Sequence, residues 1–274
     1  MWNGGGGIYF YSSDYAILSG CKVMYNTGVP FKNGDGGAAV WGQLGSYNRA
    51  PTSGTVTITD CTIVGNEGDG INIDVPQYSM YLTLNGNLIA DNTGYGAYFT
   101  SSYDMYATII GNMITGCSDE GIHLHADDEL DAYMDTTTIT YCGEEAICVH
   151  ANYGRLQIWN SDISYNSDPH LTDIGEIYAP IDLEMYGTTV THNKGLFEFY
   201  SHYVILSGCT FAHNEPYVNT KMPDNPVVRG YLGYLPSKAP EAGTALIRDC
   251  VFDNNEATGL EIYSYYGDME VIME

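Results

Sequence analysis

Short segments in which apolar and polar side chains alternate recur along the whole chain. They occur at residues 55–58, 70–74, 81–84, 96–100, 121–125, 156–159 and 259–263. Alternation with a period of two places successive side chains on opposite faces of a β-strand. Long runs of good helix formers are missing. The pattern therefore predicts an all-β chain whose strands have one inward and one outward face.

A six-residue motif with an apolar third position and a final Asn or Cys recurs between these segments. Its copies begin at Cys21, Cys61, Asn87, Asn112, Thr137, Ser161, Thr188, Cys209 and Cys250. Most copies follow one another after about 25 residues, a period typical of a solenoid repeat. Two or three short strands in that length, with no helix between them, cannot form a βαβ sheet. They can coil so that each strand pairs in parallel with its equivalent one turn later, about 4.8 Å away.

The fold class that follows is an all-β, single-stranded parallel β-helix of about ten turns. We expect residues 1–274 to form one domain, with insertions at about 29–35, 42–54 and 216–243. A strand begins close to residue 8 and another lies at 269–273, and no cap is visible at either end. We therefore expect a segment of a longer protein, or a unit whose ends stack on neighbouring molecules.

The last position of the motif predicts an asparagine ladder at an inner corner of the coil. Stacked amide side chains can donate to one another and to the turn backbone. Two consecutive turns interrupt the ladder with Cys117 and Cys142. The predicted members are Asn26, Asn66, Asn92, Asn166, Asn193, Asn214 and Asn255.

These repeats resemble those of right-handed parallel β-helix proteins. The sequence Cys-x-Phe-x-x-Asn at 209–214 and 250–255, with Gly-Gly-Gly-Gly-Ile at 4–8 and Gly-Gly-Ala-Ala-Val at 36–40, is similar to repeats of polymorphic outer-membrane and adhesin-like surface proteins. The resemblance implies a right-handed coil and an extracellular or cell-surface location. It is specific for the fold and says little about function, because lyases, hydrolases and adhesins share such coils.

Composition narrows the possible partners. The chain has 25 Tyr and 32 Gly, and its net charge of −25 would repel nucleic acid and anionic lipid. No stretch approaches the roughly 20 apolar residues of a membrane span. Six of the seven Cys fall in equivalent positions of adjacent turns, such as Cys117 and Cys142. Such pairs are either disulfides or buried thiols, and the sequence leaves both open.

One candidate site emerges when the turns are aligned. His123, His125, Cys148 and His150 should point outward from adjacent strands, and imidazole and thiol groups are ligands for Zn²⁺. Stacked carboxylates nearby would suit Ca²⁺. The remaining candidate metal ligands are Asp119, Glu120, Glu144 and Glu145, and the candidate ligand-binding residues are Asp74, Tyr98, Thr100, Asp127 and Asp128.

Two functions remain open. The first is a non-catalytic structural or adhesive solenoid, whose partner is a cell-surface glycan, a protein or another copy of the chain. The alternative is a polysaccharide lyase or glycosidase, for which Asp74, Asp127, Asp128 and Glu144 could supply paired carboxylates. No converging catalytic set is visible. An outward aromatic row could stack on sugar rings or only strengthen the sheet, and its members are Tyr9, Tyr11, Trp41, Tyr98, Tyr200 and Tyr263.

Overall fold

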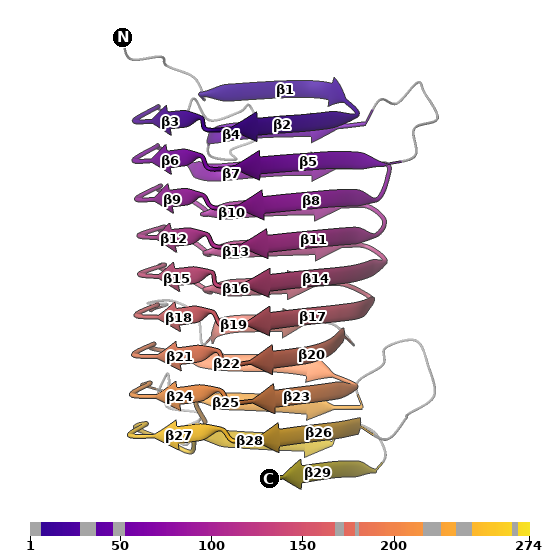
Figure 1. The fold of residues 1–274 in the computed structure, drawn as a ribbon, viewed down its shortest axis with the longest axis vertical. Helices are drawn as coiled ribbons and strands as arrows, with labels where there is room; N and C mark the ends of the chain where they lie inside the picture. Colours follow the sequence, from indigo (N-terminus) through magenta and orange to yellow (C-terminus); the bar gives the residue numbers. More distant parts are fainter. Residues whose placement is uncertain are drawn as a thin grey trace.

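The strands coil into a stack of turns with three parallel sheets. The computed structural model describes residues 7–27, 37–45, 53–167, 173–178, 181–215, 226–233, 243–264 and 268–274. Each turn contributes one strand to the first sheet, one to the second and, in all but the last described turn, one to the third. The turns succeed one another from the N-terminal to the C-terminal end of the stack (Figure 1). Within the described residues no helix is long and apolar enough to cross a membrane.

The first sheet has ten strands. They are β1 (Ile8–Ser13), β4 (Ala38–Leu44), β7 (Asp69–Val75), β10 (Ala97–Ser101), β13 (Ile122–Ala126), β16 (Ile147–His150), β19 (Asp173–Tyr178), β22 (Leu196–Ser201), β25 (Val228–Leu232) and β28 (Leu260–Ser264).

The second sheet also has ten strands. They are β2 (Tyr15–Ser19), β5 (Gly54–Thr59), β8 (Met80–Asn85), β11 (Met105–Ile110), β14 (Glu129–Asp135), β17 (Tyr153–Trp159), β20 (Ile181–Tyr186), β23 (Tyr203–Ser207), β26 (Gly243–Arg248) and β29 (Met269–Met273).

The third sheet has nine three-residue strands, which coincide with the interior of the six-residue motif. They are β3 (Lys22–Met24), β6 (Thr62–Val64), β9 (Leu88–Ala90), β12 (Met113–Thr115), β15 (Thr138–Thr140), β18 (Asp162–Ser164), β21 (Thr189–Thr191), β24 (Thr210–Ala212) and β27 (Val251–Asp253).

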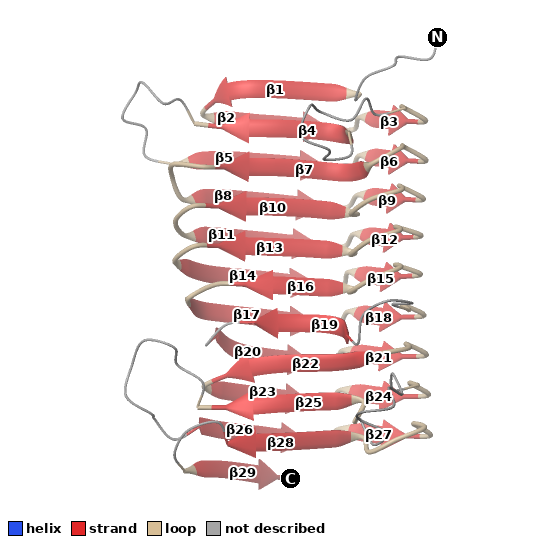
Figure 2. Cartoon of the chain, turned by 180° about the vertical axis from the view of Figure 1, so that it is seen from behind, coloured by secondary structure: helices blue, strands red, loops and turns tan. Residues whose placement is uncertain are grey.

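Parallel pairing between equivalent strands confirms the predicted fold. β10, for example, pairs in parallel with β7 of the preceding turn and β13 of the following turn. Seen from behind, the first and second sheets lie against each other and the short strands form a separate column beside them (Figure 2). The apolar residue of each alternating pair faces inward, and the resulting core runs through the stack.

The predicted asparagine ladder is confirmed. The Asn66 amide donates to Oδ1 of Asn92 at 2.9 Å, and the Asn193 amide donates to Oδ1 of Asn214 at 3.1 Å. A second ladder, which sequence reasoning missed, joins the first positions of the motif. There the Asn87 amide donates to Oδ1 of Asn112 at 2.9 Å. Two polar ladders thus satisfy buried corner backbone that would otherwise lack partners.

All seven cysteines are free thiols, and all but Cys148 occupy these same ladder and corner positions. Cys117 and Cys142 are both buried at the point where the asparagine ladder is interrupted. The sequence left open whether these two residues form a disulfide or remain buried thiols. In the structure they are buried thiols.

Parts of two of the three predicted insertions belong to the coil. Residues 42–44 lie in β4, and β25 occupies the middle of the predicted insertion at 216–243. The prediction was too broad there because the loop signals on either side obscured a five-residue strand. Residues 29–35, and the parts of the other two insertions at 46–52, 216–225 and 234–242, lie outside the described residues.

The residue before each ladder position adopts a left-handed conformation. Gly commonly fills this position, as at Gly111 (φ 63°), but the next turn has Thr136 at φ 48°. A β-branched residue is strained in this region.

We expect Thr136→Gly to raise the free energy of unfolding by up to about 1 kcal/mol. The relieved strain of about 1–2 kcal/mol exceeds the entropy that glycine adds to the unfolded chain. Urea unfolding measures the difference, and Gly111→Thr should shift stability in the opposite direction. A Thr136→Gly variant less stable than the parent would contradict this account.

Candidate functional site

The outer face of the first sheet carries the candidate metal ligands near the middle of the coil. The register places His123 of β13 beside Cys148 of β16, and His125 beside His150, as predicted. Cys148 in turn pairs with Glu176 of β19. One row across three turns therefore presents an imidazole, a thiol and a carboxylate in succession.

The Cys148 thiol lies on this outer face but is buried. The prediction that it points outward is correct in direction and wrong in exposure, since Cys148 is only 3% exposed. Neighbouring side chains cover it, and nearby ligand atoms come from Glu120, His123, His150 and Glu176. Burial raises the pKa of the thiol, and the surrounding carboxylates raise it further.

Ligand atoms gather into three overlapping groups on this face, within each of which they lie no more than 4.8 Å apart. We call the residues of these groups the histidine–cysteine patch. The groups are Glu120, His123 and Cys148; Cys148, His150 and Glu176; and Glu120, Glu144 and Glu145. Cys148 belongs to the two groups that contain an imidazole.

Two contacts fix the orientation of His123 in the patch. Nδ1 of His123 lies 2.7 Å from Oε2 of Glu120. The imidazole also stacks on the Tyr98 ring of the preceding turn, with centroids 4.5 Å apart. On the other side the His150 ring lies 5.7 Å from it. Burial, followed by the charges of His123 and His125, lowers the pKa of His150 to about 4.

The carboxylates of the patch are held in an unfavourable environment. Burial, together with Glu120, Glu144 and Glu176, raises the pKa of Glu145 to about 8. Burial and the carboxylate of Glu198 likewise raise the pKa of Glu176. Glu145 is only 5% exposed, and its Oε2 has no hydrogen-bond partner among the described residues. An unsatisfied buried carboxylate oxygen costs free energy that a cation would recover.

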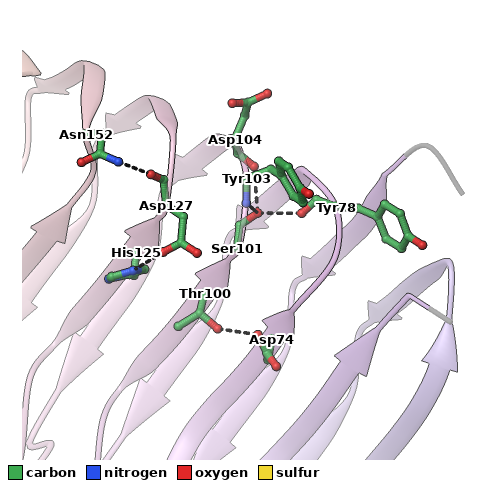
Figure 3. Close-up of polar contacts among 9 residues, drawn as sticks. All are labelled: Asp74, Tyr78, Thr100, Ser101, Tyr103, Asp104, His125, Asp127 and Asn152. Carbon is green, nitrogen blue, oxygen red and sulfur yellow. Dashed lines mark hydrogen bonds and ion pairs between the residues drawn. The ribbon is translucent and has the colours of Figure 1, made fainter. Parts of the chain in front are cut away.

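Several predicted site residues lie outside the three ligand groups. Nε2 of His125 lies 3.0 Å from Oδ1 of Asp127, and the Thr100 hydroxyl donates to Asp74 at 2.8 Å (Figure 3). Figure 3 also shows Asn152 donating to the backbone of Asp127. The hydrogen-bonding groups of these residues pair with one another. The residues therefore border the patch without belonging to a ligand group.

Asp119 and Asp128 also lie outside the ligand groups. Burial, followed by the charge of Glu120, raises the pKa of Asp119. Asp128 contributes backbone hydrogen bonds to the next turn, where Asn152 donates to its carbonyl at 3.0 Å. Of the acidic turn residues singled out in the sequence, Glu120, Glu144 and Glu145 therefore lie together in one ligand group.

Glu176 is the patch residue that sequence reasoning missed. Its signal was the alternating segment 175–178, in which Glu176 aligns with Cys148 and His123. The longer interval between copies of the motif in this turn obscures the equivalence of this segment with the preceding strands.

A second candidate site is a hollow of about 360 Å³ on the outer face of the second sheet. We call it the tyrosine hollow. The Tyr81 and Tyr106 rings stack at 5.1 Å along one side of it. The polar residues that line it are Thr55, Tyr81, Thr83, Tyr106, Thr108, Asp131, Tyr133, Arg155 and Gln157.

The predicted aromatic row on the first sheet exists in parts. The Tyr9 and Trp41 rings stack at 4.7 Å at one end, and the Tyr200, Tyr231 and Tyr263 rings stack in succession at the other. The rings face their neighbours along the coil. Stacking between neighbouring turns is the arrangement expected of aromatic pairs that strengthen a sheet.

Comparison with known proteins identifies one family. The right-handed β-helix region matches residues 1–133 and again residues 104–272. No curated protein and no solved structure matches the chain. The matched ranges overlap and run through the strands of all three parallel sheets. The chain therefore belongs to the right-handed β-helix family.

Proposed function

We propose that this solenoid is a non-catalytic cell-surface protein that binds glycans in the tyrosine hollow. The observation that carries the proposal is the row formed by Tyr81, Tyr106 and Asp131 in successive turns of the second sheet. The aromatic stack ends at Tyr106, and the next position in the row is a carboxylate. A sugar ring has an apolar C–H face and a hydroxyl edge, so it matches this change from ring to polar group.

The parallel row beside it supports the same ligand. Thr83, Thr108 and Tyr133 follow one another in register, and their hydroxyl groups can both donate and accept hydrogen bonds. The repeat spaces these groups at about 4.8 Å along the coil. A chain of sugars lying along the coil would meet a hydroxyl group at every turn.

The residues lining the hollow favour binding over hydrolysis. A glycosidase needs two carboxyl groups about 5–9.5 Å apart on either side of the scissile bond. Among the described residues that line the hollow, Asp131 is the one carboxylate, and the Arg155 guanidinium lies 3.2 Å from it. An arginine at that distance holds Asp131 as a charged anchor for hydroxyl groups.

The net charge favours a neutral glycan over an acidic one, because a chain of −25 repels polyuronates and sulfated sugars. The location at the cell surface is part of the proposal. Its support is the resemblance of the motifs at 209–214 and 250–255 to adhesin-like repeats. Antibody labelling of intact cells of the source organism tests it, and labelling only after permeabilisation would refute it.

Tyr106→Ala is expected to weaken glycan binding about five- to thirtyfold. The change removes the ring on which a sugar would stack, a contact worth roughly 1–2 kcal/mol. A panel of neutral, amino and acidic oligosaccharides on an array, followed by calorimetry on those retained, measures the effect.

Tyr263→Ala is the matched control, because Tyr263 is also exposed and stacked but lies on the first sheet. It should bind as the parent does. Retention of no oligosaccharide by the parent, or equal binding by the Tyr106→Ala variant, would refute the proposal. Release of shortened or unsaturated sugars would instead establish an enzyme.

A further inference from the structure

We infer that the histidine–cysteine patch is a binding site for a Zn²⁺-class cation, with His123, Cys148, His150 and Glu176 as its ligands. The inference is independent of glycan binding, since the patch lies on the first sheet and the tyrosine hollow on the second. Three of the eight metal ligands predicted from the sequence remain in this set, and Glu176 is the fourth ligand.

The donor types select the class of cation. Cys148 shares one ligand group with His123 and another with His150 and Glu176. Thiolate and imidazole are ligands for Zn²⁺ and related transition metals, whereas Ca²⁺ and Mg²⁺ require oxygen ligands throughout. A set of two nitrogens, one sulfur and one carboxylate oxygen matches a four-coordinate Zn²⁺ site.

The distances within each ligand group, and the 5.7 Å between the His123 and His150 ring centroids, require only side-chain movement. Ligand atoms around tetrahedral Zn²⁺ lie about 3.5 Å from one another, from bonds of about 2.0–2.3 Å. Those of the patch lie within 4.8 Å of one another in each group. Backbone pairing within the first sheet holds β13, β16 and β19 in parallel register. The backbone is therefore already in place for a metal site.

Glu120 orients one ligand. Its carboxylate can accept a hydrogen bond from Nδ1 of His123 at 2.7 Å. This contact makes Nδ1 the protonated nitrogen and leaves the lone pair of Nε2 for a cation. A carboxylate partner of this kind is the usual means by which proteins orient a metal-binding imidazole.

A second, independent observation also points to a cation. The Oε2 atom of Glu145 is buried and has no hydrogen-bond partner among the described residues. Its carboxylate gathers with those of Glu120 and Glu144 beside the ligands. Like charges at this spacing repel one another, and a divalent cation reverses the sign of that interaction.

The test is a metal titration of the full chain after treatment with EDTA. We expect one equivalent of Zn²⁺ to bind and to raise the melting temperature, and Ca²⁺ and Mg²⁺ to have a much smaller effect. Co²⁺ should bind at the same site and give a thiolate-to-cobalt charge-transfer band. Cys148→Ser should abolish that band and weaken Zn²⁺ binding by more than about tenfold.

His125→Ala is the matched control, because His125 lies on the same strand but outside the ligand groups. It should leave Zn²⁺ affinity unchanged. Cys21 and Cys250 are the partly exposed thiols. The double variant Cys21→Ser/Cys250→Ser shows whether Zn²⁺ binds these thiols instead. We expect this variant still to bind one equivalent of Zn²⁺.

His150→Ala and Glu176→Gln test the same site if the Cys148→Ser variant fails to fold. Each removes one ligand from the outer face and should weaken Zn²⁺ binding by more than about tenfold while leaving the circular dichroism spectrum unchanged. The inference is overturned if folded variants keep the parent affinity, if the parent binds no Zn²⁺, or if Ca²⁺ binds as tightly as Zn²⁺.

Discussion

Asn193→Ala is expected to lower the free energy of unfolding by about 3–5 kcal/mol. Asn193 is only 1% exposed, and its amide donates to the Ile163 carbonyl at 2.9 Å and to Oδ1 of Asn214 at 3.1 Å. Its Oδ1 accepts hydrogen bonds from the backbone and the side chain of Asn166. Alanine leaves several buried polar groups without these partners, at about 1–3 kcal/mol for each group that stays unsatisfied.

Urea unfolding followed by circular dichroism measures this loss. The matched control is Asn152→Ala, because Asn152 is exposed and makes its side-chain hydrogen bond to the Asp127 backbone at the surface. We expect the control to cost less than about 1 kcal/mol. If both variants lost similar stability, the ladder would not be a major source of stability in this coil.

The asparagine ladder could be predicted because it depends on the repeat alone. Stacking requires only that Asn66 and Asn92 occupy equivalent positions, and the motif fixes those positions in the sequence. The same reasoning applied to the first motif position would have found the ladder of Asn87 and Asn112. That position varies among Cys, Asn, Thr and Ser, and this variation concealed its shared role in accepting backbone hydrogen bonds.

The histidine–cysteine patch shows where alignment of turns is not enough. Alignment gave the register of His123 with Cys148 and of His125 with His150. It could not give side-chain orientation, which turns His123 toward Glu120 and His125 toward Asp127. These contacts decide which imidazole joins the thiol, and they depend on the turn residues that flank each strand.

The tyrosine hollow was missed for a different reason. Tyr81 and Tyr106 stand 25 residues apart at equivalent positions, so the row was visible in the sequence. The outward rows of the second strand in each turn were not aligned. A hollow also depends on differences in side-chain size between neighbouring rows, which register alone does not reveal.

The contribution of Glu145 to the stability of the metal-free chain is expected to fall as the pH rises from about 5 to 8. Burial and the neighbouring Glu120, Glu144 and Glu176 raise its pKa from 4.5 to about 8 in the folded chain. Between these two values the folded state binds a proton that the unfolded state has released, so its stability is full below 4.5 and is lost as the pH passes 8. Each pKa unit corresponds to about 1.4 kcal/mol, which sets an upper limit of about 5 kcal/mol on the loss.

Glu145→Gln isolates this contribution, because the amide has the same size and no charge to bury. In EDTA, the variant should exceed the parent in unfolding free energy by several kcal/mol at pH 9 and match it within about 1 kcal/mol at pH 5. Glu67→Gln, at an exposed corner of the coil, should follow the parent within about 0.5 kcal/mol at both pH values. Parallel pH profiles for the parent and Glu145→Gln would mean that the Glu145 carboxylate is solvated. The patch would then lack the buried charge that a cation relieves, and the zinc site would have to rest on the geometry of Cys148 and its imidazole neighbours alone.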